Sequence, residues 1–321
     1  MLPSQITDPN ALLPGLSAVI PVYNSAESLP ALLSALSRTM LDLAVDYEVI
    51  LVNDGSKDNS WNVIQNLTQL YPVIVGINLM RNYGQQNATL CGIRLARYAI
   101  IVTLDDDLQN PPDEIRKLLA KLEEGYDVVY GAPEKVHQNI WRTLASQAIR
   151  LILQSVMGND VGRQVSPFRV FRTSIREAFS NYASPSVSID VLLTWGATRF
   201  AAIPVRHEAR QIGISTYTFG KLVSLAVSML TGFSTLPLRL ASMIGFFFTF
   251  FGVGVLVYVI GRYVINGGSI AGFPFLASVI AIFSGATLFA LGIIGEYLAR
   301  IFTHSMGQPP YVVFGKSKFN E

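Results

Sequence analysis

The chain has 321 residues, of which half are hydrophobic and only 14% are charged. An average soluble domain has about 25% charged residues, so part of this chain is unusually apolar. The formal net charge of +2 is too small to indicate a nucleic-acid-binding protein. The single cysteine, Cys91, excludes an intrachain disulfide and agrees with a reducing compartment.

The first 133 residues alternate short apolar segments, rich in β-branched residues, with longer segments of helical spacing. The helical pattern is clearest over 112–124, where a proline and two acidic residues precede leucines on one face. This alternation predicts an α/β fold with a mostly parallel sheet and helices on both faces. The expected strands are Leu16–Tyr23, Tyr47–Val52, Val73–Leu79, Ile100–Leu104, Tyr126–Tyr130 and Ala201–Val205.

Two segments near the C-terminus lack Asp, Glu, Lys and Arg: 22 residues between Arg239 and Arg262, and 33 between Arg262 and Glu296. As a helix the first would be roughly 33 Å long, about the thickness of the hydrocarbon core of a bilayer. We predict two transmembrane helices, at about 240–262 and 274–298, joined as a hairpin by a glycine-rich turn. The alternative is a pair of helices buried in a soluble core, which this length disfavours.

The flanking charges predict how such a hairpin would be oriented. Basic residues flank its outer ends at Arg239, Arg300, Lys316 and Lys318, whereas the turn offers only Arg262. The first 15 residues lack the pattern of a cleaved signal peptide. We therefore expect an integral protein of the inner (cell) membrane with its N-terminal domain in the cytoplasm.

These patterns divide the chain into four parts. The apolar segments 138–157 and 217–236 are either helices in the membrane interface or helices packed on the sheet, and the sequence leaves both open. The expected parts are a globular cytoplasmic domain over 1–215, an interface helix or linker over 216–238, two transmembrane helices within 239–300, and a cytoplasmic tail over 301–321.

Polar residues follow four of the expected strands at the point where each ends. Asn24 follows the first strand, Asp54 the second, Asn82 the third and Asp105 the fourth. The carboxyl ends of parallel strands meet at one edge of a sheet, which is where ligands bind in open α/β folds. The sequence therefore predicts a binding site at this edge.

Three adjacent aspartates, Asp105, Asp106 and Asp107, give the sharpest signal at this edge. At about 4 Å two carboxylates repel by about 1 kcal/mol in water and by roughly 4 kcal/mol at an effective dielectric of 20. In an extended backbone Asp105 and Asp107 point the same way and Asp106 points the opposite way. Their oxygens suit Mg²⁺ or Mn²⁺, which takes further ligands from water and substrate phosphates. The alternative is a solvated acidic turn.

Asp54 and Gly55 follow the second expected strand. Asp54 is placed to accept hydrogen bonds from a nucleobase or ribose. Alternatively it caps the following helix, a role that Ser56 and Asp58 offer equally. Gly55 permits a close approach of the backbone.

Six motifs occur in the order and at the spacing seen in one enzyme family. They are Val19–Asn24 (VIPVYN), Val52–Asp58 (VNDGSKD), Arg81–Gln85 (RNYGQ), Leu104–Pro112 (LDDDLQNPP), Phe168–Arg172 (FRVFR) and Gly295–Arg300 (GEYLAR). The chain thereby resembles family-2 glycosyltransferases of GT-A fold, and specifically the polyisoprenyl-phosphate glycosyltransferases. It is similar to undecaprenyl-phosphate glucosyltransferases and undecaprenyl-phosphate 4-deoxy-4-formamido-L-arabinose transferases, and more distantly to dolichol-phosphate mannose synthases. The resemblance assigns 1–215 to a GT-A catalytic domain.

The resemblance also implies roles for individual residues. Asp105 and Asp107 would bind the metal ion and the diphosphate, and together with Arg169 they are the expected catalytic residues. Arg142, Arg163 and Arg169 would clamp the acceptor phosphate near the membrane surface. The expected nucleotide-sugar site consists of Pro21, Tyr23, Asn24, Asp54, Gly55, Asn82, Asp106, Gln109, Arg210 and Ser215.

Three positions depart from the resembled pattern. Ser25 stands where glutamate is usual, and Thr216 where lysine is frequent. Pro167 stands where some relatives carry an acidic residue before the Phe-Arg pair. A phosphate monoester with a second pKa of about 6 is mostly dianionic at neutral pH, so we expect the acceptor to attack without a protein base. Asp160 and Asp107 remain the candidates if a base is needed.

The resemblance predicts an inverting, metal-dependent transfer of a sugar from a nucleotide-diphosphate sugar, in the first place a UDP-hexose, to a polyisoprenyl phosphate such as undecaprenyl phosphate. The product would be a lipid-linked sugar donor for cell-envelope glycosylation. Two alternatives stay open: a non-catalytic, membrane-anchored nucleotide-sugar-binding protein, and a processive polysaccharide synthase, which the lack of a Gln-x-x-Arg-Trp motif disfavours. The expected partners are the donor, the lipid acceptor and the bilayer, with no nucleic acid; a homo-oligomer stays open.

Overall fold

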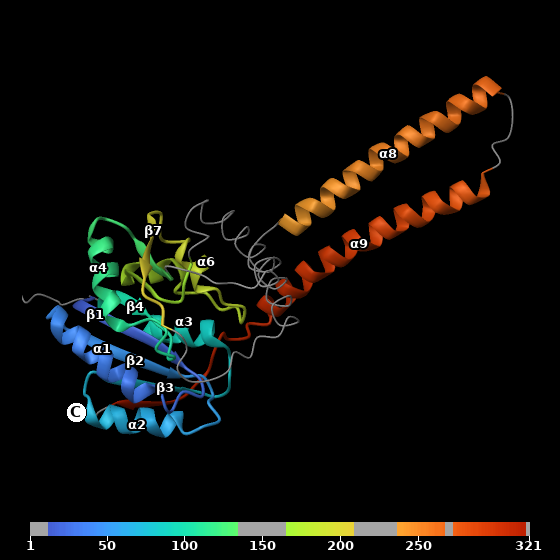
Figure 1. Cartoon of the computed structure of the whole chain (residues 1–321). Helices are drawn as coiled ribbons and strands as arrows, with labels where there is room; N and C mark the ends of the chain where they lie inside the picture. The colour runs from blue at the N-terminus through green and yellow to red at the C-terminus, as the bar shows by residue number, and fades with distance from the viewer. Residues whose placement is uncertain (1–11, 134–164, 209–235, 267–271, 319–321) are drawn as a thin grey trace, which may run out of the picture. The chain divides into compact units, whose positions relative to one another are not determined.

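The computed structural model describes residues 12–133, 165–208, 236–266 and 272–318 (Figure 1). The chain forms two compact units: Met1–Thr218 together with Gly307–Glu321, and Phe219–Met306. The C-terminal segment therefore belongs to the same unit as the N-terminal domain.

The first unit is built on a mixed sheet, which has eight strands within the described residues, in the order β7-β5-β6-β4-β1-β2-β3-β8. The central strands β3, β2, β1 and β4 are parallel to one another, and β7 is parallel to β5. β6 and β8 run antiparallel to the strands that they pair with. The strands are β1 (Leu13–Val22), β2 (Tyr47–Asn53), β3 (Ile74–Leu79), β4 (Tyr98–Thr103), β5 (Val128–Pro133), β6 (Arg169–Arg172), β7 (Phe200–Val205) and β8 (Val313–Lys318).

Helices connect most of these strands. The segment predicted to be helical at 112–124 consists of a 3₁₀ turn, η1, followed by an α-helix, α4. The helices of this unit are α1 (Leu29–Leu43), α2 (Ser60–Leu70), α3 (Gln85–Leu95), η1 (Pro112–Glu114), α4 (Ile115–Glu123), η2 (Thr173–Phe179) and α6 (Ile189–Leu193).

The predicted mostly parallel sheet is confirmed, and each of the six expected strands is present with small shifts at its ends. β1, for example, begins at Leu13, three residues before the predicted start. Two strands were not predicted. β6 is a short antiparallel strand between β4 and β5, and β8 comes from the segment that the sequence analysis assigned to a cytoplasmic tail.

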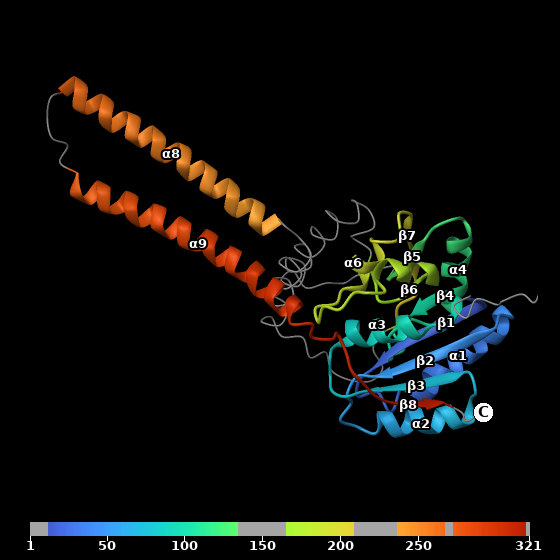
Figure 2. The ribbon, with the colours of Figure 1, turned by 180° about the vertical axis from the view of Figure 1, so that it is seen from behind.

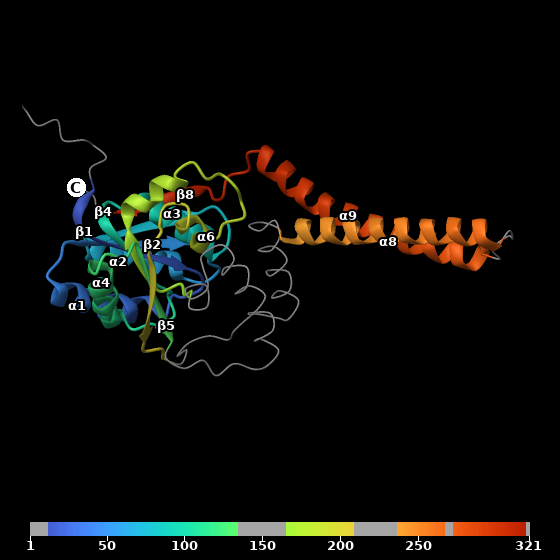
Figure 3. The same cartoon turned by 90° about the horizontal axis from the view of Figure 1, so that it is seen from above.

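Two apolar layers cover the two faces of this sheet. On β1, Ala18 and Ile20 belong to the layer that contains residues of α1, α2 and α4. Val19, between them, belongs to the layer that contains residues of α3, η2 and α6. Successive side chains of a strand point to opposite faces, and Figures 1 and 3 show α3 and α6 on the other side of the sheet from α1 and α4. Coverage on both faces explains why the central strands are continuously apolar in sequence.

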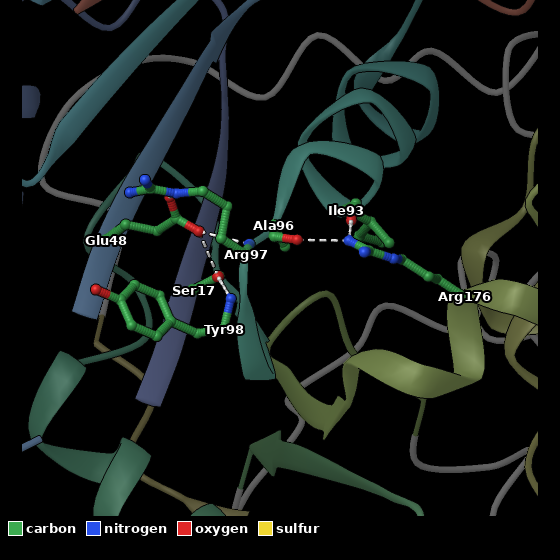
Figure 4. Close-up of polar contacts among 7 residues, drawn as sticks. All are labelled: Ser17, Glu48, Ile93, Ala96, Arg97, Tyr98 and Arg176. Carbon is green, nitrogen blue, oxygen red and sulfur yellow. Dashed lines mark hydrogen bonds and ion pairs between the residues drawn. The ribbon is translucent and has the colours of Figure 1, made fainter. Parts of the chain in front are cut away.

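A buried glutamate ties three segments together at the amino-terminal ends of the central strands (Figure 4). Glu48 of β2 accepts hydrogen bonds from Ser17 Oγ and from the backbone N–H of Arg97, each at 2.7 Å. The Arg97 Nε atom also lies 2.9 Å from Glu48 Oε2, and the Glu48 side chain is only 2% exposed. The Ser17 hydroxyl in turn accepts a 3.2 Å hydrogen bond from the Tyr98 N–H. The cluster joins β1, β2 and the start of β4.

We expect Glu48→Ala to lower the free energy of unfolding by about 2 kcal/mol, because a buried hydroxyl and a backbone N–H would lose their partner. Thermal unfolding of the detergent-solubilised chain, followed by circular dichroism, measures the change. Glu123→Ala removes an exposed carboxylate of α4 and should change stability by less than about 0.5 kcal/mol. Equal melting temperatures for the two variants would contradict this role of Glu48.

Strand β8 returns the chain to the sheet after the second long helix (Figure 2). It pairs with β3 in a register that sets Gly76 opposite Ser317, and Ser317 Oγ lies 2.8 Å from Thr68 Oγ1 of α2. Just before β8, the ring of Tyr311 lies 5.8 Å from the Arg94 guanidinium of α3. These contacts make the C-terminal segment a structural part of the first unit.

Ending the chain after Met306 should therefore destabilise the first unit by about 3 kcal/mol or more. Several strand hydrogen bonds would be lost, each contributing about 0.5–1.5 kcal/mol, and β3 would become an unprotected edge that invites aggregation. A chain that ends after Lys318 keeps all of β8 and is the matched control. The prediction fails if both truncated chains melt and remain monodisperse like the full-length protein.

The second unit contains two long helices, α8 (Leu236–Asn266) and α9 (Phe273–Ser305), which run side by side in Figures 1 and 2. The rings of Phe248 and Phe283 contact edge to face across them, with centroids 5.6 Å apart. Near the end of α9, Glu296 and Arg300 form an ion pair at 3.1 Å, one helical turn apart.

The two long helices are apolar on their exposed surfaces. The segments long and apolar enough to cross a membrane are Pro237–Ile265, of 29 residues, and Ile282–Ser305, of 24 residues. At a rise of about 1.5 Å per residue, each exceeds the roughly 30 Å of a bilayer core. Length and composition of the described helices thus agree with the predicted pair of spans.

Candidate active site

The strand order places a topological switch point in the middle of the sheet. β2 and β3 lie on one side of β1 and β4 on the other, so the connections from β1 and β4 leave in opposite directions. Ligands bind at such points, beyond the carboxyl ends of the strands. The loops after β1, β2, β3 and β4 lie together at this edge. Each of them is hydrogen-bonded to at least one of the other three.

The loop after β1 is held to the aspartate cluster through Asp106. The Tyr23 N–H and the Ser25 hydroxyl donate to Asp106 Oδ2 at 3.0 and 2.5 Å. The Ser28 hydroxyl donates to the Asp106 carbonyl at 2.7 Å. Asp106 thus points toward this loop. The backbone at Asp106 and Asp107 forms a turn, so the alternation predicted for an extended backbone does not describe it. Ser25, which departs from the resembled pattern, is one of its partners.

The same loop is also held to the loop after β2. Asn24 has a positive φ of 55°. Its N–H donates to Ser56 Oγ at 3.0 Å, and its Oδ1 accepts from the Lys57 N–H at 2.7 Å. Tyr23 is 43% exposed at the rim, whereas Pro21 is buried within β1. Of these predicted nucleotide-site residues, Tyr23 and Asn24 are accessible from the edge.

Asp54 organises the loop after β3. Its carboxylate accepts hydrogen bonds from the backbone N–H groups of Tyr83 and Gly84, at 2.7 and 2.8 Å. Burial raises the pKa of Asp54, and these two hydrogen bonds oppose the rise. That Asp54 accepts a hydrogen bond from a nucleoside stays a prediction, since in this structure both carboxylate oxygens already accept from backbone N–H groups.

Gly55 allows the loops after β2 and β3 to meet. Its φ is +64°, and a Cβ added there would lie 2.5 Å from the Asn82 nitrogen and 2.6 Å from the Arg81 carbonyl carbon. The close approach predicted for this glycine is therefore made to the protein backbone. Asn82 itself is exposed at the same edge.

Asp105 is held by a residue that the sequence analysis did not select as a site residue. Gln85, the first residue of α3, donates from Nε2 to Asp105 Oδ1 at 2.5 Å. Burial, and then the neighbouring carboxylates of Asp107 and Asp106, raise the pKa of Asp105 to about 7, against a smaller opposing effect of Arg169. Gln85 belongs to the motif Arg81–Gln85, but nothing in its sequence position shows that it contacts Asp105.

Asp107 and Gln109 lie in the turn that follows. The Gln109 N–H donates to Asp107 Oδ1 at 3.1 Å. The Gln109 carbonyl accepts a 2.8 Å hydrogen bond from the Glu208 N–H, so the segment after β7 reaches the same edge of the sheet. The structure thus brings Gln109 beside the aspartates.

The acidic cluster fits a divalent cation that takes only part of its ligands from protein. Within the described residues, no group of three or more His, Cys, Asp or Glu side chains has the arrangement of a complete metal site. Asp106 faces the β1 loop, which leaves Asp105 and Asp107 as the carboxylates that would hold an ion. Two carboxylates plus phosphates and water are a common ligand set of Mg²⁺ and Mn²⁺. Besides burial, repulsion by Asp107 and Asp106 raises the pKa of Asp105, and a bound cation would relieve that repulsion.

Arg169 lies in the sheet interior and is 1% exposed. Its Nη1 is paired with the Asp190 carboxylate, and its Nε donates to Thr103 Oγ1 at 3.1 Å. No sequence pattern had indicated Asp190 as its partner. A contact between Arg169 and an acceptor phosphate stays a prediction.

The other predicted phosphate and sugar contacts lie outside the described residues: Arg142, Arg163, Arg210 and Ser215, together with the candidate base Asp160 and the departure at Thr216.

Residues 17–182 match the family model for glycosyl transferase family 2, which covers more than half of the chain. The chain belongs to glycosyl transferase family 2. It is therefore a glycosyltransferase that uses nucleotide-activated sugars. The predicted GT-A fold is confirmed. The aspartate cluster and the loops after β1, β2 and β3 all lie within the matched residues.

The solved structures that are similar to this glycosyltransferase include two synthases of sugar phosphoglycerates. Mannosyl-3-phosphoglycerate synthase from Rubrobacter xylanophilus is 17% identical, with a TM-score of 0.50, over 67% of this chain and 71% of that chain. Glucosyl-3-phosphoglycerate synthase from Mycobacterium tuberculosis, solved with Mn²⁺, UDP-glucose and phosphoglyceric acid, is 14% identical, with a TM-score of 0.50, over 68% of this chain and 78% of that chain. At such identities the similarity shows the fold alone.

Proposed function

We propose that this glycosyltransferase moves a hexose from a nucleotide-diphosphate sugar, in the first place UDP-hexose, to a polyisoprenyl phosphate at the cytoplasmic face of the inner membrane. One observation supports a lipid acceptor: the same chain contains a family-2 glycosyltransferase domain and two apolar helices long enough to cross a bilayer. An acceptor with a lipid tail in the bilayer would hold its reacting phosphate at the membrane surface, within reach of a domain anchored to that membrane. The lipid-linked sugar would then serve cell-envelope glycosylation.

The donor would bind across the loops at the carboxyl edge of the sheet. Tyr23 and Asn24 lie exposed after β1 and Asn82 after β3, a position suited to the nucleoside. The diphosphate would lie toward Asp105 and Asp107. The similar enzyme from Mycobacterium tuberculosis holds Mn²⁺ together with UDP-glucose, which agrees with a uridine nucleotide and a divalent cation here.

Catalysis would then consist of charge neutralisation and positioning. A bound Mg²⁺ or Mn²⁺ would neutralise the departing diphosphate. Asp105 and Asp107 would hold that ion, and Gln85 holds Asp105 in place at 2.5 Å. Because the acceptor phosphate is mostly dianionic at neutral pH, it would attack the anomeric carbon directly, opposite the leaving group, and the configuration would invert. The proline at 167 is consistent with a reaction that uses no base at that position.

The acceptor phosphate would be held by cationic side chains near the membrane surface. We assign this role to Arg142 and Arg163, and a further phosphate contact to Arg210. A guanidinium can donate two parallel hydrogen bonds to one phosphate, which gives both charge and geometry. Reversal of the charge of Arg142 or Arg163 should raise the KM for the lipid far more than that for the donor.

The direct test incubates the purified full-length protein with a panel of labelled nucleotide-sugars and three acceptors: undecaprenyl phosphate, undecaprenol without the phosphate, and 3-phosphoglycerate. We expect label in the lipid fraction with undecaprenyl phosphate alone, and only with Mg²⁺ or Mn²⁺ present. Asp107→Asn should abolish the transfer. The proposal is wrong if label enters 3-phosphoglycerate and not the lipid, or if the donor binds without turnover under all these conditions.

A further inference from the structure

Two series of contacts, connected through short stretches of backbone, lead from Asp105 to Asp190, and they run through side chains that have no assigned part in the nucleotide-sugar site. The first series starts with Gln85 of α3, which donates to Asp105 Oδ1 at 2.5 Å. The next residue of α3, Gln86, accepts a 3.1 Å hydrogen bond from the Ile189 N–H at the start of α6. The residue after Ile189 is Asp190, so α6 is held to the helix that contacts Asp105.

The second series of contacts runs through the sheet. Asp190 is ion-paired with Arg169 of β6. The Arg169 Nε donates to Thr103 Oγ1 at 3.1 Å, and the Thr103 hydroxyl donates to the Pro167 carbonyl at 2.6 Å. Thr103 is the last residue of β4 and stands two residues before Asp105. Two residues of backbone therefore connect this series to the aspartate from which the first series began.

The pair of Arg169 and Asp190 is shielded from water. Arg169 is 1% exposed, and the side chain of Asp190 is 14% exposed. Tyr130 of β5 is fully buried, and the charges of Asp190 and Arg169 shift the pKa of its hydroxyl in opposite directions. The positive charge of Arg169 acts on Asp105 electrostatically. The Nε and Nη1 atoms of Arg169 are bonded to Thr103 and Asp190, so its charge is held in a fixed position.

We propose that Asp190 is a positioning residue that fixes the Asp105 carboxylate for the metal–diphosphate complex, through Arg169 on one side and through Gln86 and Gln85 on the other. This inference rests on the proposed function only in taking Asp105 as a metal ligand. It gives Arg169 a positioning role in place of contact with the acceptor phosphate. Groups that orient metal ligands typically alter metal affinity or activity by about 10- to 100-fold when they are removed.

The mildest test is Gln86→Met, which keeps the length of the side chain and removes only the acceptor for the Ile189 N–H. The measurement is the affinity for Mn²⁺ in the presence of UDP, from the electron paramagnetic resonance of free Mn²⁺, without acceptor or turnover. We expect an affinity about 10-fold weaker than in the wild type, with kcat lower and the KM for the acceptor unchanged. Gln69→Met, on the exposed part of α2, is the matched control and should leave both values unchanged.

Two variants at 190 separate positioning from folding. Asp190→Asn removes the charge beside the buried Arg169, and Asp190→Glu keeps it. We expect the Mn²⁺ affinity per folded molecule to fall by about 10-fold or more in Asp190→Asn and to recover in large part in Asp190→Glu. If Gln86→Met and the folded fraction of Asp190→Asn both bind Mn²⁺ with UDP as the wild type does, the pair is only structural and the inference is overturned.

The readout also separates this inference from the proposed acceptor. A wild type that binds Mn²⁺ with UDP, loses affinity on Gln86→Met, and transfers no sugar to undecaprenyl phosphate would uphold the positioning role and refute the acceptor. The opposite outcome is a wild type that makes the lipid product with Mn²⁺, while Gln86→Met and Asp190→Asn make it with unchanged kcat and metal affinity. That outcome would uphold the acceptor and refute the positioning role.

Discussion

Asp105→Asn should abolish sugar transfer while making the metal-free protein more stable at neutral pH. The variant removes one of the two carboxylates proposed to hold the cation, so we expect kcat to fall by about 10³-fold. It also removes a carboxylate that burial and two neighbouring aspartates disfavour. The gain in stability should be on the order of 2 kcal/mol, a reduced figure because the side chain is partly exposed.

The pH dependence of this gain has a definite sign. The pKa of Asp105 is about 7 in the folded chain, above its ordinary value of 3.8. Such a group contributes stability in full below about pH 4, and the contribution is lost as pH rises through about 7. The stabilising effect of Asp105→Asn should therefore be present at pH 8 and absent near pH 4. Thermal unfolding in a chelator at several pH values measures it.

Mn²⁺ with UDP should reverse the order of stability, because only the wild type would gain binding energy from the ion. Asp42→Asn, an exposed aspartate at the end of α1, is the control and should leave activity and stability unchanged. A loss of metal-free stability in Asp105→Asn at pH 8 would contradict the strained acidic cluster. Retained transfer would contradict its role in catalysis.

Gly55→Ala should displace the loop after β3. The added methyl group would lie 2.5 Å from the Asn82 nitrogen, and the atoms that it meets belong to backbone, which cannot rotate away. We expect a loss of about 3 kcal/mol in stability, the sum of overpacking and of a positive φ in a residue with a Cβ. Because Tyr83 and Gly84 bond to Asp54 and Gln85 bonds to Asp105, kcat/KM for the donor should fall by at least about 10²-fold.

Gly307→Ala is a closely matched control for this variant. Gly307 has a φ of +63°, almost the same as the +64° of Gly55, and no atom lies within 4 Å of its added Cβ among the described residues. Gly307→Ala should lower the free energy of unfolding by about 1 kcal/mol, because only the strain of the left-handed conformation is added. Equal melting temperatures for the two variants would show that the clash with the Arg81–Asn82 peptide has no effect.

The sequence patterns were most informative for strands buried on both faces. The central strands are short apolar segments, each followed by polar residues, and this pattern predicted both the sheet and the edge that carries the site. The three adjacent aspartates also predicted an acidic cluster at this edge, although Asp106 and Asp107 lie in a turn and not in an extended backbone. These features depend on residues near one another in the chain, or on strands of one parallel sheet.

Contacts between distant segments could not be predicted in this way. β8 pairs with β3 across more than 230 residues, and its sequence, Val313–Lys318, has no apolar alternation that marks a strand. Arg169 follows a phenylalanine in a familiar motif, which suggested a phosphate contact. Only the structure shows Asp190 as its partner, because α6 folds back from another part of the chain. For Asp54, the sequence suggested ligand binding or helix capping, and neither pattern predicted the bonds to Tyr83 and Gly84.

The most direct test of the proposed reaction is the structure and stoichiometry of the lipid product. Full-length protein in detergent, supplied with undecaprenyl phosphate, Mn²⁺ and the donor found in the screen, would be followed by ³¹P and ¹H nuclear magnetic resonance. We predict one nucleoside diphosphate released per lipid phosphate converted to a glycosyl phosphodiester, with the anomeric configuration of the donor inverted. Release of nucleoside diphosphate with free sugar and unchanged lipid phosphate would contradict the account, as would a product that retains the donor's configuration.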